Sequence, residues 1–117
     1  MSEKKYSWHK VAESQEELFS SGNKLLEITV NNKQICIVSH KNQLYGCAHK
    51  CPHAGGRMSD GWLDSIGNIV CPLHRYRFDI SNGRNVSGEG YYLKIYPVEQ
   101  RSDGLYVGFE EKSWFSF

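Results

Sequence analysis

Two short segments in which a cysteine and a histidine lie close together constrain this sequence more than any other feature. The first is Cys51-Pro-His53 and the second is Cys71-Pro-Leu-His74, with 17 residues between them. Thiolates and neutral imidazoles are the ligands that zinc, copper and iron–sulfur clusters take from proteins. The pattern therefore predicts one four-ligand metal site built from two equivalent loops.

The order of the ligands leaves two kinds of site open. Structural zinc sites typically begin with two cysteines about two to four residues apart and end with two histidines. Here each loop offers one cysteine and one histidine, which suits a 2Fe-2S cluster whose irons are held by two cysteines and by two histidines, respectively. The spacing favours the cluster, and a zinc-stabilised binding module is the alternative.

The rest of the chain has the pattern of short strands separated by turns. Apolar and polar residues alternate with the period of two that is typical of strands. The predicted strands are 25–30, 34–39, 43–48, 69–71, 76–80, 91–99 and 105–110. Residues 61–70 are predicted to form a hairpin that places the two loops side by side. The only predicted helix, 14–19, begins with the capping-box spacing of Ser14 and Glu17, so the sequence predicts an all-β fold.

The length and charge of the chain narrow its class. A chain of 117 residues buries one ordinary core, so we expect a single domain. Its 14 basic and 13 acidic residues nearly balance, which argues against nucleic acid as a partner. The first residues lack the apolar stretch of a signal peptide, and no run reaches the roughly 18 apolar residues of a membrane span. We therefore expect a cytoplasmic protein with no membrane partner.

The remaining cysteines and polar loop residues have ordinary interpretations. Cys36 and Cys47 lie in apolar strand sequences, so we expect both to be small buried residues. His49 is expected to be a polar loop residue rather than a fifth ligand. For Arg57 and Asp60, the sequence favours two solvated charges over an ion pair.

The two loops resemble the pattern of the Rieske iron–sulfur proteins, in which Cys-X-His and Cys-X-X-His are separated by a spacer of this length. Flanking residues resemble the family as well, namely Met58-Ser-Asp-Gly61, Phe78-Asp79 and Asn82-Gly83. The resemblance implies one 2Fe-2S cluster bound by Cys51, His53, Cys71 and His74. It also implies a single domain over 1–117, with an antiparallel β-sandwich base and a small cluster-binding subdomain at about 48–80.

The family resemblance also implies a function. High-potential Rieske proteins carry a disulfide between the two loops and hydroxyl groups near the cluster, but this chain has Gly56 and Leu73, and Tyr76 and Phe78, at the corresponding positions. Fewer hydrogen bonds to sulfur favour a lower potential within a family range of roughly −150 to +300 mV. The chain thus resembles the soluble ferredoxins that serve dioxygenases.

A ferredoxin of this kind carries single electrons from a ferredoxin reductase to a terminal oxygenase or another redox acceptor, and it performs no reaction of its own. The alternative within the family is a small redox subunit of a larger reductase, such as an assimilatory nitrite reductase. In the two loops, Lys50, Arg57, Arg75 and Arg77 outnumber Asp60 and Asp79. A basic tip of this kind predicts an acidic docking surface on the partner. The aromatic tail at 114–117 is expected to pack on its own domain.

Overall fold

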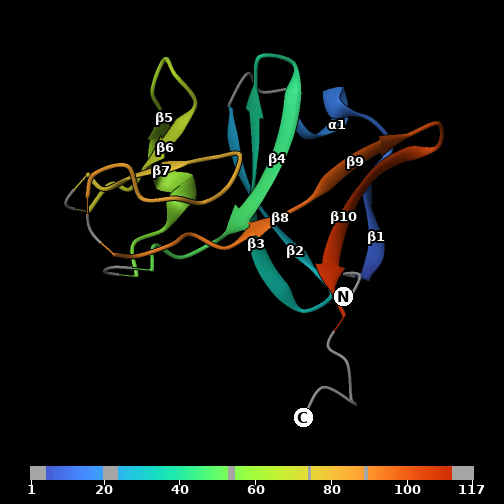
Figure 1. Cartoon of the computed structure of the whole chain (residues 1–117). Helices are drawn as coiled ribbons and strands as arrows, with labels where there is room; N and C mark the ends of the chain where they lie inside the picture. Colours follow the sequence, from blue (N-terminus) through green and yellow to red (C-terminus); the bar gives the residue numbers. More distant parts are fainter. Residues whose placement is uncertain (1–4, 20–23, 53–54, 74, 89, 112–117) are drawn as a thin grey trace, which may run out of the picture.

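The computed structural model describes residues 5–19, 24–52, 55–73, 75–88 and 90–111. Within these residues the chain forms three antiparallel sheets, with strand orders β1-β10-β9, β2-β3-β4-β8 and β5-β6-β7 (Figure 1). The strands are β1 (Tyr6–Ala12), β2 (Leu25–Val30), β3 (Lys33–His40), β4 (Gln43–Ala48), β5 (Trp62–Leu63), β6 (Asn68–Val70), β7 (Arg77–Asp79), β8 (Ile95–Tyr96), β9 (Val98–Arg101) and β10 (Gly104–Glu110). The helical elements are α1 (Gln15–Phe19) and the 3-10 turn η1 (Met58–Asp60). The predicted antiparallel β fold is confirmed.

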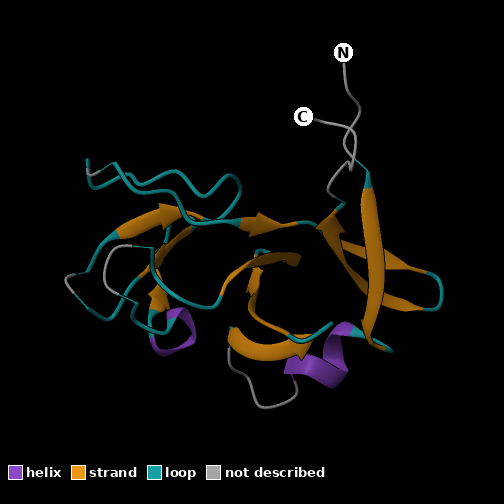
Figure 2. Cartoon of the chain, turned by 90° about the horizontal axis from the view of Figure 1, so that it is seen from below, coloured by secondary structure: helices purple, strands orange, loops and turns teal. Residues whose placement is uncertain are grey.

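The sheet formed by β2, β3, β4 and β8 lies between the other two, as the view from below shows (Figure 2). Strand β3 is buried on both faces, with Ile35, Cys36, Ile37 and Val38 all inaccessible to solvent. Ile35 and Ile37 pack in one apolar core with Val107 of β10. The alternate residues, Cys36 and Val38, pack in a second core that contains the two cysteine loops. The two cysteine loops therefore rest directly on the central sheet.

Tight turns fix the register of this central sheet. β2 joins β3 through Asn31 and Asn32, both of which have a positive φ, and Val30 pairs with Lys33 on either side of the turn. Lys41 and Asn42 form the same kind of turn between β3 and β4. Two consecutive left-handed residues match the twist of a two-residue hairpin, and asparagine tolerates that conformation well. The pairing places Glu27, Cys36 and Cys47 in one row across three strands.

Most predicted elements are present, and the differences have physical causes. The predicted strands 25–30 and 43–48 match β2 and β4, and the backbone amide of Glu17 donates to the Ser14 hydroxyl at the start of α1, as the capping box requires. The predicted strand over 91–99 is wrong as a single element, because Pro97 lies between β8 and β9, which belong to different sheets. Proline has no backbone N–H for a ladder. Strand β1 was not predicted.

The hairpin predicted over 61–70 is confirmed by the pairing of β5 with β6. The Asp64 carboxylate closes its turn by accepting hydrogen bonds from the backbone amides of Ile66 and Asn68. No helix in the described part of the chain is long and apolar enough to cross a membrane. The aromatic tail at 114–117, expected to pack on the domain, lies outside the described residues.

A substitution at Gly61 tests how closely η1 approaches the β5–β6 hairpin. A methyl group on Gly61 would overlap the carbonyl group of Val70, the residue before Cys71. The backbone of Gly61 has an ordinary φ of −85°, so only the lack of space excludes a side chain. We expect Gly61→Ala to lower the free energy of unfolding by about 2 kcal/mol in urea denaturation. Gly90→Ala, where the added carbon meets open space, should change it by less than about 0.5 kcal/mol.

Candidate metal centre

The first cysteine loop is a backbone-closed turn that follows β4. The Cys51 amide donates to the Gly56 carbonyl at 2.7 Å, and the Gly55 amide donates back to the Cys51 carbonyl at 2.9 Å. One step further out, the Met58 amide donates to the His49 carbonyl at 2.8 Å. These bonds join the two stems of the loop, so the position of Cys51 is set by its own backbone.

The second loop joins β6 to β7. The Cys71 amide donates to the Tyr76 carbonyl at 2.9 Å, which closes the turn at its base. Arg75 has a φ of 59°, in the left-handed region that a non-glycine residue rarely occupies. Because Arg75 immediately follows His74, the left-handed residue directs the chain back toward β7 directly after the predicted ligand.

The fold brings the thiols of the two loops together. Cys51 is 2% exposed and Cys71 is fully buried, and both belong to the same apolar core. Burial raises the pKa of the Cys71 thiol to about 11, with a further contribution from the neighbouring Cys51 thiol. Two adjacent cysteine sulfurs shielded from water are the donor set that one iron of a 2Fe-2S cluster takes. The described cysteines therefore fit such a cluster.

Gly56 is the point where the loops meet. A Cβ atom on Gly56 would lie 3.0 Å from Cγ of Leu73 and 3.1 Å from the Cys71 sulfur. A side chain at this point would press against the opposite loop unless Leu73 moved or were replaced by a smaller residue. Gly56 and Leu73 are the positions at which the family resemblance placed the disulfide of high-potential members, and they face each other here.

The predicted ligands are only partly visible in the structure. Cys51 and Cys71 lie together, whereas His53 and His74 lie outside the described residues. Among the described residues, no group of three or more histidine, cysteine or acidic side chains could hold a metal ion. The assignment of the histidines therefore stays a prediction.

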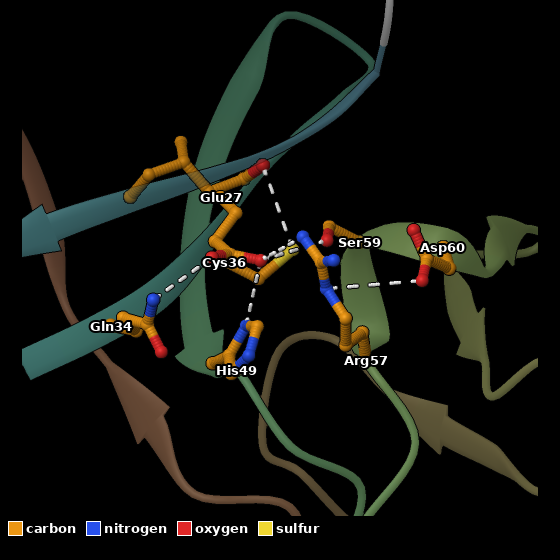
Figure 3. Close-up of polar contacts among 8 residues, drawn as sticks. Glu27, Gln34, Cys36, His49, Arg57, Ser59 and Asp60 are labelled. Carbon is orange, nitrogen blue, oxygen red and sulfur yellow. Dashed lines mark hydrogen bonds and ion pairs between the residues drawn. The ribbon is translucent and has the colours of Figure 1, made fainter.

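One contact beneath the first loop was not anticipated from the sequence (Figure 3). Arg57 donates a 2.7 Å hydrogen bond to Glu27 on β2 and lies 3.8 Å from Asp60, so the preference for solvated charges was wrong. His49 is buried, and its Nδ1 atom lies 3.0 Å from the Glu27 carboxylate, although it makes no well-aligned hydrogen bond with the described residues. The acidic partner was missed because Glu27 lies 30 residues before Arg57.

Cys36 and Cys47 are fully buried strand residues, as predicted. They pair directly across β3 and β4. Their proximity to each other and their burial hold the pKa of Cys47 well above its ordinary value. The Cys47 thiol is therefore protonated at neutral pH, and both residues pack as small apolar side chains.

Two closed loops carried on antiparallel sheets hold two buried thiols next to each other, an arrangement that fits an iron–sulfur domain. Residues 7–97 match the family model of the Rieske [2Fe-2S] domain. The chain belongs to this family.

Similar proteins agree with this assignment. The chain is 36% identical over 76 residues to the ferredoxin component of the naphthalene 1,2-dioxygenase system of Pseudomonas aeruginosa, covering 64% of this chain and 72% of the relative. The ferredoxin of carbazole 1,9a-dioxygenase from Nocardioides aromaticivorans IC177 has a TM-score of 0.66 at 22% identity, covering 73% of this chain and 84% of that one. A protein assigned as the small subunit of an NADH-dependent nitrite reductase from Mycobacterium tuberculosis has a TM-score of 0.74 at 13% identity, covering 90% and 96%. At these identities the structural matches establish the fold.

The contact between Gly56 and Leu73 predicts that a cross-link between the loops will form. In a disulfide, the Cβ of one cysteine lies about 3 Å from the sulfur of the other, and the Cβ of residue 56 would lie 3.0 Å from Cγ of Leu73. We expect the variant Gly56→Cys/Leu73→Cys to form this bond on oxidation, detected by peptide mass mapping. Closing the loop should stabilise the oxidised form by about 3 kcal/mol relative to the reduced form of the same variant.

The matched control moves the first cysteine by one residue. A Cβ on Gly55 meets no atom within 4 Å, so Gly55→Cys/Leu73→Cys should remain reduced under the same conditions. Equal cross-linking in both variants would show that the loops do not hold the register described here.

Proposed function

We propose that this protein is a Rieske-type ferredoxin, a one-electron carrier that passes electrons from a reductase to the oxygenase component of a dioxygenase system. The observation that carries this proposal is the adjacent burial of Cys51 and Cys71 in two loops of a Rieske domain. The relative from the naphthalene dioxygenase system, itself a ferredoxin component, supports the choice of partner class. The carrier would act in the cytoplasm.

The four predicted ligands would divide between the two irons. Cys51 and Cys71 would hold one iron through their thiolates, and His53 and His74 would hold the other through neutral imidazoles. When bound, the cluster accepts and releases one electron. The sulfur atoms of Cys51 and Cys71 are shielded from water, because Met58, Ile69 and Phe78 are fully buried in the same core. The buried Phe78 has no hydroxyl group to donate to a sulfide, which favours a potential in the lower part of the family range.

The chain would act as a carrier rather than as an enzyme. A Rieske oxygenase needs a second, mononuclear iron site with two histidines and a carboxylate, whereas the relative that supports this proposal is the ferredoxin component of a dioxygenase system. The nitrite reductase subunit of similar fold makes a tightly held redox subunit the second candidate. Copurification separates the two candidates, since a ferredoxin is isolated alone and a subunit is isolated in its complex.

Cluster content tests the proposal directly. The anaerobically purified protein should be brown and contain two irons and two acid-labile sulfides per chain, and its visible spectrum should bleach with dithionite. His53→Ala and His74→Ala should each abolish the cluster, because an iron that loses one protein ligand becomes open to water and exchange. Arg75→Ala should keep it. Stoichiometric zinc without iron after anaerobic reconstitution would refute the proposal.

Charge around the loops predicts how the partner docks. Arg57 is exposed but its charge is offset by Glu27, so the cations of the two loops that we expect to attract a partner are Lys50, Arg75 and Arg77. Exposed cations attract an acidic partner surface, and the attraction is screened by salt. Electron transfer from a competent dioxygenase reductase, followed by stopped flow, should therefore slow with ionic strength and slow further in Arg75→Glu.

The control charge is Lys41, which is exposed in the turn before β4, whereas the first cysteine loop follows that strand. Lys41→Glu makes the same change in net charge far from the loops and should leave the rate close to that of the wild type. Equal losses in the two variants, or rates that ignore salt, would reject the loops as the docking surface.

A further inference from the structure

The Glu27 carboxylate is the meeting point of four side chains (Figure 3). Its Oε1 atom accepts from Arg57 at 2.7 Å and from the Ser59 hydroxyl at 3.5 Å, and the His49 ring nitrogen lies 3.0 Å away. Its Oε2 atom accepts from the Gln34 side chain at 3.2 Å. Within the described residues, Glu27 is thus the point at which the central sheet binds the first cysteine loop through ionic and polar contacts.

The partners of Glu27 include residues on both sides of the loop that carries Cys51. His49 lies two residues before Cys51, Arg57 lies one residue after Gly56, and Ser59 lies in η1 just beyond. The backbones of Lys50 and Arg57 pair with each other as an isolated antiparallel bridge. A single carboxylate on β2 therefore contacts both stems of the loop that carries Cys51.

The Glu27 carboxylate is better shielded from water than an ordinary surface carboxylate, although its partner Arg57 is exposed. The Glu27 side chain is only 20% exposed, and the hydrogen bond from Arg57 holds the pKa of its carboxyl group below the usual range. A carboxylate that is largely removed from water and surrounded by donors loses much when one partner is removed, because the remaining charge is left without compensation. Exposed pairs such as Arg101 with Glu99 lack this shielding.

We propose that Glu27 is a positioning residue for the cluster, holding both stems of the Cys51 loop on the central sheet through His49 and Arg57 and setting the local charge beneath that loop. Glu27 makes no contact with either thiol among the hydrogen bonds and ion pairs of the described residues and acts through these two neighbours. The inference rests on the proposed function, since it concerns a cluster bound by Cys51.

The proposal predicts two separate effects in the protein that carries the cluster. If the carboxylate holds the loop, its loss should expose the iron to capture by a chelator. If it also sets the local charge, Glu27→Gln should raise the reduction potential, because removing a negative charge favours the added electron. Arg57→Gln removes the opposing charge, so it should loosen the loop equally and shift the potential downward. A purely structural role would not produce shifts of opposite sign.

The experiment uses the anaerobically loaded full-length protein and an iron chelator, with loss of the visible absorption as the readout and the midpoint potential measured alongside. We expect iron release to be on the order of tenfold faster in Glu27→Gln and in Arg57→Gln than in the wild type. The double variant should release iron no faster than the faster single variant, because both changes break one contact. The control is Glu99→Gln, which breaks the exposed pair with Arg101 and should match the wild type.

The outcomes separate the two proposals. A wild-type protein that holds no cluster refutes the proposed function itself. A loaded wild type with Glu27→Gln behaving like Glu99→Gln refutes the positioning role alone. If Glu27→Gln does not fold, Arg57→Gln decides the matter, since the Arg57 side chain is 56% exposed and its replacement should be tolerated. Release at the wild-type rate, or a potential shifted upward, in Arg57→Gln would overturn the proposal.

Discussion

The contact between the two cysteine loops is the constraint on which the rest of this structure depends. Two thiols must lie side by side away from water, although 19 residues separate Cys51 from Cys71 in the sequence. The β5–β6 hairpin spans that separation, and Gly56 allows the loops to approach until only a side chain from Leu73 lies between them. The central sheet supplies apolar side chains beneath the loops, with Cys36 and Val38 in the same core as Cys51 and Cys71.

The central sheet is also what allows polar groups to be placed beneath the loop. Because Glu27, Cys36 and Cys47 share one row, a charged side chain at the outer strand lies beside apolar side chains in the middle. The carboxylate can be largely buried there because Arg57, Ser59 and Gln34 donate to it. Glu27 thus joins a largely buried charge on the sheet to the position of the first cysteine loop.

The parts of the structure that the sequence predicted well depend on local patterns. Strands β2 and β4 and the cap at Ser14 follow from alternation and from spacing within a few residues. The proximity of Cys51 and Cys71 could be predicted because few residue types bind iron, and their role as ligands stays a prediction. The contacts of Glu27 with His49, Arg57 and Ser59 could not be predicted, since they link residues 22 to 32 positions apart and depend on the register of a sheet. The break at Pro97 was missed because the apolar pattern continues through it.

The burial of all four cysteines has a practical consequence for the metal-free chain. Cys36, Cys47, Cys51 and Cys71 are each at most 2% exposed, so a thiol reagent reaches them only when the surrounding structure opens. The first pair lies in the central sheet and the second in the loops, which makes the alkylation rate of each pair a separate measure of how often that part of the molecule opens. The chain therefore carries its own probes of local stability, and mass spectrometry after pulsed alkylation could compare the opening of the loops with that of the sheet beneath them.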